Sequence, residues 1–436
     1  MTDSVNSREL VLAILLSVTR EEVYSHIAIA NVLGKYQYLD KKERAFITRV
    51  SEGTIEHMLE LDYIISQFSK IRMNKMKPVI RCILRGAVYE MRYMDSVPLS
   101  ATCNEAVKLA KRKGFGNLSG FVNGVLRNIG RNLDKIVYPK KEENAVEYLS
   151  VTYSVPEWLI GLWSKTYSME EIERMCEAFL TEEPLSIRVN LNKITPKELT
   201  KRLEAQGITV QQDDTLSYAL HIGGVDYLLG IPEFEEGLFY VQDISSMKVA
   251  EAAGVREGYY VLDVCGAPGG KSIHIAQMMN GTGTVVTRDV SEYKVGLIEE
   301  NIARHQVHNM RAELHDARVL DEKSVGRADI VIADLPCSGL GVLRKKSDIK
   351  YKMNMEKIKS LAALQQEILN VAEQYVKDGG IMVYSTCTID RMENEDNVEQ
   401  FLMTHTNYIL EGMEQILPDE TGNDGFFIAR LRKCAV

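Results

Sequence analysis

Cys337 and Cys387 are the side chains of this sequence that are best placed to do chemistry. Cys337 follows "ADIVIADLP" and Cys387 ends "GGIMVYSTC", and both of these apolar runs predict buried strands. Ligands of an open parallel sheet bind at the carboxyl ends of its strands, so both thiols are expected at one ligand-binding edge. Four other cysteines are expected to be inert, buried side chains: Cys82, Cys103, Cys176 and Cys434.

A thiolate beside a carboxylate is suited to methylation of carbon 5 of a pyrimidine ring. Carbon 5 is too weak a nucleophile to attack a methyl sulfonium directly, but a thiolate that adds to carbon 6 converts the ring into an enamine. Asp334, in the run that precedes Cys337, is placed to hydrogen-bond to N3 or to protonate it. A second thiol or another base could assist product release, and the spacing leaves open which cysteine attacks.

The loop "VLDVCGAPGGKS", residues 261–272, predicts a ligand-binding turn between a strand and a helix. Glycines let the backbone approach a ligand closely, and the following helix start offers free N–H groups. A tight turn with a purely structural role would also need them. The loop matches neither the phosphate-loop pattern G-x-x-x-x-G-K-[ST] nor the dinucleotide pattern G-x-G-x-x-G.

Acidic residues follow the successive strands of this region. Asp289 lies at the end of "TVVTRDV", Asp316 follows a short third strand, and Asp334 closes the fourth. S-adenosylmethionine offers a ribose diol, an adenine amino group and an ammonium group, all of which are donors that a carboxylate accepts. The sequence therefore predicts S-adenosylmethionine as the cofactor, because a dinucleotide would need the missing pyrophosphate cradle.

The pattern along the chain predicts three domains that position these residues. Residues 1–138 show helical periodicity almost throughout, including a continuous helical pattern over 41–68, and form an all-α domain. Residues 139–235 mix helix and strand signals, as in a small α+β module. Residues 236–436 alternate apolar strands with helices and predict a doubly wound, Rossmann-like α/β domain around a parallel sheet.

Charge is divided unevenly between these parts. Residues 1–140 hold 22 Lys and Arg against 14 Asp and Glu, a net charge of +8, while the whole chain carries −9. The segment 344–359 also holds seven basic and two acidic residues. Solvated helix faces would give a similar excess, but both regions are expected to contact RNA phosphates.

Composition excludes several classes of protein. No stretch approaches the ~20 apolar residues of a membrane span, and the N-terminus lacks the features of a secretory signal. Seven cysteines without a C-x-x-C pair argue against a disulfide framework and against zinc. We expect a cytoplasmic protein without a metal.

The sequence resembles the RsmB (Fmu/Sun) family of RNA 5-cytosine methyltransferases. "LDVCGAPGGK", "DLPCSG" and "YSTCT" are similar to the cofactor, Pro-Cys and Thr-Cys motifs of that family, and "SIRVN", "VQDISS" and "DGFFIARL" also match its pattern. Residues 1–138 resemble the antitermination factor NusB, most clearly at "FVNGVLRNI". Gly266 departs from the usual Ala, and Arg288 departs from a small or apolar residue.

The resemblance implies a role for each motif residue. Asp289 would hold the ribose, Asp316 the adenine side, and Asp334 the catalytic centre. Cys387 would be the nucleophile and Cys337 would assist product release. Cys265 would not be catalytic. The loop residues would line the methionine and ribose side of the cofactor: Cys265, Gly266, Ala267, Pro268, Gly269, Gly270 and Lys271.

The function implied by the resemblance is methylation of carbon 5 of a specific cytosine in 16S ribosomal RNA, through a covalent cysteine–cytosine intermediate. We expect a monomer whose partner is small-subunit ribosomal RNA. Methylation of transfer RNA by the same fold is an alternative. A non-catalytic RNA-binding assembly or antitermination factor is another, and the intact pair Cys337 and Cys387 argues against it.

Overall fold

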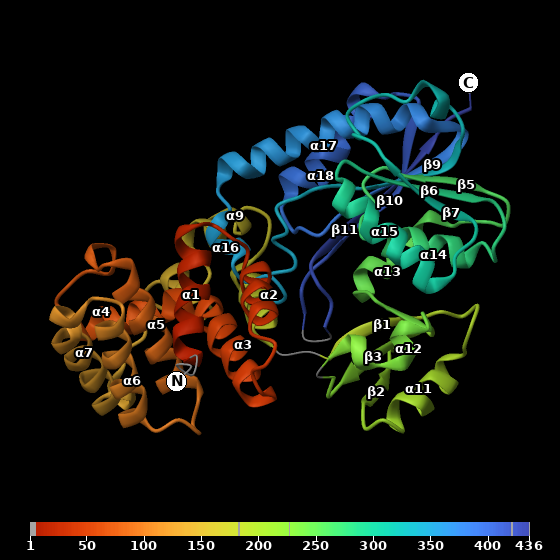
Figure 1. The fold of residues 1–436 in the computed structure, drawn as a ribbon. Coiled ribbons are helices and arrows are strands. Elements are labelled where there is room, and N and C mark those ends of the chain that lie inside the picture. Colours follow the sequence, from red (N-terminus) through yellow and green to blue (C-terminus); the bar gives the residue numbers. More distant parts are fainter. Residues whose placement is uncertain (1–5, 182–183, 226, 420–421, 436) are drawn as a thin grey trace. The chain divides into compact units, whose positions relative to one another are not determined.

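The structure, a computed structural model, describes residues 6–181, 184–225, 227–419 and 422–435. The chain forms two compact units (Figure 1). Unit 1 consists of Met1–Leu180 and the later segment Leu343–Lys352, and unit 2 consists of Thr181–Val342 and Met353–Val436. Shortly after the Pro-Cys motif, the chain therefore passes from unit 2 into unit 1, and it returns to unit 2 at Met353.

Unit 1 is helical in all its described elements, as predicted for residues 1–138. Its helices are α1 Ser7–Arg20, α2 Ser25–Lys35, α3 Lys41–Glu56, α4 Met58–Phe68, α5 Pro78–Tyr93, α6 Leu99–Arg112, α7 Ser119–Arg131, α8 Ala145–Thr152, α9 Glu157–Trp163, α10 Met169–Leu180 and α16 Ile349–Lys352. The helices α8 to α10 belong by their contacts to this unit, although the sequence analysis placed them in the middle module. The continuous helix expected over 41–68 is wrong, because the chain breaks at His57.

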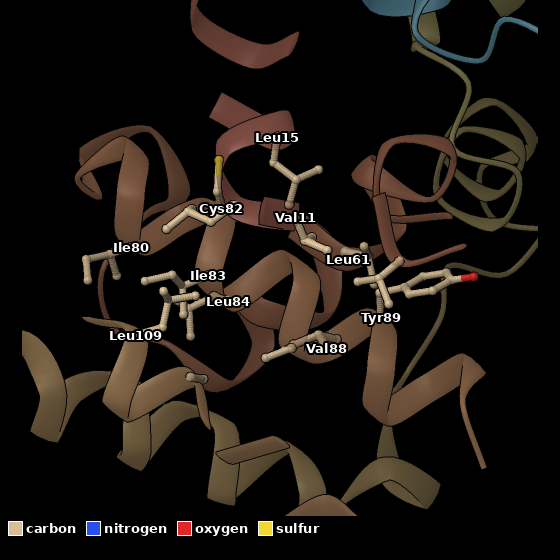
Figure 2. Packing of buried hydrophobic residues seen from close by; sticks show 14 of the residues in the cluster. Val11, Leu15, Leu61, Ile80, Cys82, Ile83, Leu84, Val88, Tyr89 and Leu109 are labelled. Atoms are coloured by element: carbon tan, nitrogen blue, oxygen red, sulfur yellow. The ribbon is translucent and has the colours of Figure 1, made fainter. Parts of the chain in front are cut away.

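The core of unit 1 forms around α5. Figure 2 shows Leu84 and Val88 of this helix among the apolar side chains of its neighbours, including Val11 and Leu15 of α1. These side chains recur at helical spacing, so each helix buries one stripe and exposes the other face. The periodicity that predicted the helices therefore also predicted this core.

The segment Leu343–Lys352 packs against unit 1 through buried polar groups. The Asp348 carboxylate, which is fully buried, accepts hydrogen bonds from the backbone N–H of Ser25 at 3.0 Å and from its hydroxyl at 2.7 Å. Lys350, which is 2% exposed, donates to the carbonyl of Glu56 at 2.9 Å. Lys352 donates to Asp348 at 2.6 Å. The prediction that this segment contacts RNA phosphates is therefore wrong for Lys350 and Lys352.

A small antiparallel sheet begins unit 2. Its strands are β1 Leu185–Val189, β2 Thr209–Gln212, β3 Ala219–Gly223 and β4 Phe239–Val241, in the order β2-β3-β1-β4. The helices beside it are α11 Pro196–Glu204 and the short α12 Pro232–Glu235. Thr195 and Glu198 form a reciprocal capping box at the start of α11. This is the α+β module that the mixed pattern predicted.

The larger sheet of unit 2 holds the predicted ligand edge. Its strands are β5 Tyr260–Asp263, β6 Thr284–Asp289, β7 Met310–Leu314, β8 Ala328–Asp334, β9 Val376–Thr386, β10 Tyr408–Ile416 and β11 Phe426–Lys433, in the order β10-β11-β9-β8-β5-β6-β7. The five strands β5 to β9 are parallel, and the Rossmann-like fold is confirmed. The antiparallel pair β10 and β11 was not predicted.

Helices cover both faces of this sheet (Figure 1). They are α13 Ile244–Ala253, α14 Gly270–Met278 and α15 Glu292–His305 on one face, and α17 Met355–Tyr375 and α18 Glu395–Thr404 on the other. Val261 of β5 packs on the face that α13, α14 and α15 cover, and its neighbour Leu262 packs on the opposite face, because successive strand residues point to opposite sides of a sheet. This explains why the strands read as continuous apolar runs.

Asp348→Ala should lower the free energy of unfolding of unit 1 by about 1–3 kcal/mol, because the buried donors of Ser25 lose their acceptor. Differential scanning calorimetry of the full chain measures this loss. Asp95→Ala, at an exposed position of the same unit, serves as the control and should change stability by less than about 0.5 kcal/mol. Equal effects in the two variants would contradict the structural role of the segment.

Candidate active site

The predicted site residues gather at the carboxyl edge of the large sheet. Asp289 and Asp334 are the last residues of β6 and β8, and Cys387 directly follows β9. Asp316 lies two residues beyond the end of β7. These strands run parallel, so their carboxyl ends meet at one edge. The structure therefore brings together residues that are up to about a hundred positions apart in the sequence.

A buried carboxyl group, Asp263, anchors the glycine-rich loop at the end of β5. Its oxygens accept hydrogen bonds from the Ser272 hydroxyl at 2.5 Å and from the backbone N–H of Cys265 at 3.3 Å. Burial raises the pKa of Asp263 to about 7. The carboxyl ties the start of the loop to the helix that follows it. The sequence analysis gave this acid no role.

Two glycines of the loop are required by the packing of the protein itself. A Cβ atom on Gly266 would lie 2.3 Å from the methyl carbon of Thr287 and 2.5 Å from an oxygen of Asp263. A Cβ atom on Gly270 would lie 2.8 Å from the ring of Tyr240. Gly266, which departs from the Ala expected from the resemblance, is therefore the residue that fits beside Thr287 in this chain.

Arg188, from the "SIRVN" motif in β1, supports the same loop from the small sheet. Its guanidinium donates to the carbonyl of Gly270 at 2.9 Å and to the side chain of Gln242. The side chain is buried, and burial lowers its pKa to about 9. Sequence reasoning missed this contact, since nothing in the motif shows which loop the arginine reaches.

Cys265 is a partly buried loop residue. Burial raises the pKa of its thiol well above the usual range, and the nearby Asp263 and Asp289 add to that shift. A thiol held in this form is a poor nucleophile, because the thiolate is the reactive species.

Asp289 and Asp316, which are expected to bind the cofactor, differ from each other in burial and in partners. Asp289 is 5% exposed, and its carboxylate accepts a hydrogen bond from the backbone N–H of Ser291 at 3.3 Å. Lys294 lies 3.5 Å from its other oxygen. Asp316 is paired with Arg318 through both oxygens, at 3.0 and 2.7 Å, and this pairing lowers the pKa of Asp316 to about 2. An adenine amino group would have to share Asp316 with Arg318.

Asp334 is held from two sides at the centre of the edge. Lys271 lies 2.8 Å from one carboxylate oxygen, and the Ser385 hydroxyl donates to the other at 2.8 Å. Burial lowers the pKa of Lys271, but the Asp334 charge outweighs it and the net shift is upward. Lys271, which the resemblance assigns to the cofactor loop, thus also contacts the expected catalytic centre.

The sulfur atoms of Cys337 and Cys387 lie 3.4 Å apart. The backbone holds this contact, because the N–H of Gly341 donates to the carbonyl of Cys387 at 3.1 Å. Gly425 in turn donates to the carbonyl of Gly341 at 2.8 Å, and a Cβ atom on Gly341 would lie 2.0 Å from the Gly425 oxygen. The hydrogen bond to Cys387 and burial raise the pKa of Cys337 well above the usual range.

A polar network lies behind the Pro-Cys loop. Glu393 is fully buried and accepts hydrogen bonds from Ser338 and Gln365. Burial raises the pKa of Glu393 to about 7. The sequence analysis gave this residue no role; it lies just before α18, which begins at Glu395.

S-adenosylmethionine fits the donors and acceptors at this edge. The nearly buried Asp289 carboxylate offers acceptors for a ribose diol, and the loop from Cys265 to Lys271 leads into the free N–H groups at the start of α14. Within the described ranges, no helix is long and apolar enough to cross a membrane, and no group of three or more His, Cys, Asp or Glu is placed to hold a metal ion.

Three family matches cover most of the chain in the order of its domains. Residues 5–131 match the NusB family. Residues 155–225 match the ferredoxin-like domain of RsmF/B-like methyltransferases. Residues 252–432 match the 16S rRNA methyltransferase RsmB/F family. The resemblance that the motifs indicated is confirmed.

Relatives match over their whole length. The probable ribosomal RNA small subunit methyltransferase B of Bacillus subtilis is 35% identical, over 98% of this chain and 98% of its own. The corresponding Synechocystis protein is 32% identical, over 98% of this chain and 100% of its own. The crystal structure of PH0851 is similar with a TM-score of 0.82 and 25% identity, over 99% of each chain.

A further solved structure shares the fold of a large part of the chain. NSun6 from Pyrococcus horikoshii, solved with SFG, gives a TM-score of 0.59 at 23% identity, over 64% of this chain and 99% of its own. The full-length relatives, the family matches and the fit of the sheet edge point the same way. The chain belongs to the RsmB/F family of small-subunit ribosomal RNA methyltransferases, with S-adenosylmethionine as its methyl donor.

Proposed function

We propose that this enzyme methylates carbon 5 of a specific cytosine in 16S ribosomal RNA through a covalent intermediate on Cys387. The observation that carries the proposal is the contact of two thiols, 3.4 Å apart, at strand ends beside Asp334. A direct transfer to a ring nitrogen or a ribose oxygen would need no cysteine. Methylation of carbon 5 does need one, because carbon 5 becomes nucleophilic only after a thiolate has added to carbon 6.

The first step is addition of the Cys387 thiolate to carbon 6. The sulfur–carbon bond forms, and the electrons of the C5=C6 double bond move toward carbon 5 and N3. Asp334 binds the N3 edge of the ring and shares a proton with it as negative charge develops there. Lys271 and Ser385 each hold one oxygen of Asp334 and so fix its direction.

S-adenosylmethionine supplies the electrophilic methyl group that carbon 5 accepts. The carbon 5 proton then leaves to a base, such as water, and its electron pair re-forms the C5=C6 double bond. The sulfur of Cys387 leaves carbon 6 with the pair of the broken bond. Cys337, whose pKa is raised, is a thiol at neutral pH and donates its proton toward that departing sulfur.

The remaining residues bind the two substrates. Asp289 holds the ribose, Asp316 the adenine side, and the loop from Cys265 to Lys271 the methionine and ribose side. Residues 1–140, with a net charge of +8, dock ribosomal RNA through its phosphates. We expect a monomer that acts in the cytoplasm, where its RNA is made.

The direct test is incubation of the purified chain with naked small-subunit RNA and S-adenosylmethionine, followed by detection of 5-methylcytosine. The proposal expects one modified cytosine in that RNA. Modification of transfer RNA instead would favour the alternative substrate. RNA binding without any methylation would favour a non-catalytic assembly or antitermination factor.

Asp289→Ala should weaken S-adenosylmethionine binding by about 1–3 kcal/mol, because the ribose hydroxyls lose a buried acceptor. Isothermal titration calorimetry measures the change. Asp378→Ala, at an exposed position near the amino end of β9, is the control and should leave affinity unchanged. Unchanged affinity in Asp289→Ala would contradict the ribose assignment.

Gly266→Ala should also weaken cofactor binding, by about 1–3 kcal/mol, because the added methyl group forces Thr287 or Asp263 out of place. Gly296→Ala on α15 is the matched control, since no atom lies within 4 Å of its added Cβ. The same calorimetric titration compares the two. Equal affinity would show that the loop relaxes around Ala.

Cys387→Ala should abolish methylation and adduct formation, because it removes the thiolate that activates carbon 5. Cys337→Ala should still form the adduct but release it slowly, so that protein–RNA complexes survive denaturing electrophoresis. If the adduct formed in Cys387→Ala but not in Cys337→Ala, Cys337 would be the nucleophile and Cys387 the thiol that assists release. Full activity in both variants would remove covalent catalysis from the mechanism.

A further inference from the structure

Glu393 is a fully buried acid for which the proposed chemistry has no use. It accepts three hydrogen bonds, from a backbone N–H, a hydroxyl and a side-chain amide. The backbone N–H of Ser338 donates to one oxygen at 2.9 Å, and the Ser338 hydroxyl donates to the other. Gln365 donates to the first oxygen at 3.0 Å. Burying a charged group is costly unless it is bonded in this way.

This network holds the chain beside both cysteines. Ser338 directly follows Cys337, and its hydroxyl contacts the hydroxyl of Thr388 at 2.8 Å. Thr388 directly follows Cys387. The amide of Gln365 that reaches Glu393 also donates to the carbonyl of Pro336 at 2.9 Å, on the other side of Cys337. The backbone on each side of Cys337 is thus bonded to Glu393 or to its partner.

The two N–H groups that bond to Glu393, those of Ser338 and Gln365, can only donate. The side-chain oxygen of Gln365 accepts from Asn397 at 2.7 Å and from the hydroxyl of Tyr384 at 3.2 Å. This fixes the Gln365 amide with its NH₂ group toward Glu393. A glutamine at position 393 would keep its one acceptor oxygen for these two N–H groups, and its NH₂ group would then face the Ser338 hydroxyl, which would have to accept instead of donate.

We propose that Glu393 is a positioning residue that holds Cys337 against Cys387 while the product is released. The inference rests on the proposed function, in which Cys337 donates to the departing Cys387 sulfur. Cofactor and RNA binding use other residues, and Cys387 attacks without help from Cys337. Loss of the network should therefore slow release alone.

The test measures the formation and the decay of the protein–RNA adduct separately in the full chain. Glu393→Gln should form adduct at the wild-type rate and resolve it more slowly, by roughly up to a hundred-fold, which is the scale for displaced catalytic groups. The KM values for S-adenosylmethionine and RNA should not change, while kcat falls. Glu233→Gln, at a buried glutamate that binds Gln206 in the small module, is the matched control and should behave as wild type.

The double variant Cys337→Ala/Glu393→Gln separates positioning from general damage. If Glu393 acts through Cys337, the double variant should resolve the adduct no more slowly than Cys337→Ala alone, since the effects of residues that act as one unit do not add. Multiplied effects in the double variant, or a changed KM in Glu393→Gln, would overturn the proposal.

Ser338→Ala tests the same contact if Glu393→Gln does not fold, which its melting temperature shows. It removes the hydroxyl bonds to Glu393 and Thr388 but keeps the backbone N–H bond, so release should slow in this variant as well. If Ser338→Ala and any folded Glu393→Gln release the product at the wild-type rate while Cys337→Ala releases it slowly, the role of Glu393 is overturned and that of Cys337 stands. Fast release in Cys337→Ala overturns the proposed role of Cys337, and this inference with it.

Discussion

The contact between Cys337 and Cys387 depends on the pairing of β8 with β9. Asp334 and Ser385 are paired at the ends of these parallel strands, so the residues that follow them leave the sheet side by side. A shift of one residue in this register would turn the side chains to the opposite face and separate the acid from the thiols. The apolar core on both faces of the sheet fixes the register, because most residues of β8 and of the carboxyl-terminal half of β9 are buried.

Buried carboxyl groups hold the two loops that leave this edge. Asp263 ties the glycine-rich loop to α14, and Glu393 ties the Pro-Cys loop to the backbone beyond β9. Each is fully buried, and burial raises each pKa to about 7. The hydrogen bonds that each accepts offset part of the cost of burial and fix backbone segments that carry no regular structure.

The segment Leu343–Lys352 is held in unit 1 by buried polar groups as well. The chain leaves unit 2 at Val342, and Asp348 and Lys350 of this segment are buried and hydrogen-bonded within unit 1. A lysine in a basic run is normally expected on a solvated surface. Here Lys350 and Lys352 are part of the packing of unit 1, so the net charge of the run alone does not indicate an RNA contact.

The sequence by itself determined the three-part fold, the five parallel strands and the edge where Cys337, Cys387 and Asp334 lie, because apolar periodicity and strand ends are local signals. It missed β10, most of whose residues are exposed, since such a strand has no buried apolar run. Only the tertiary structure decided which polar groups meet. Arg188 with Gly270 and Glu393 with Ser338 are contacts between residues 82 and 55 positions apart, and such pairings follow from packing rather than from any local pattern.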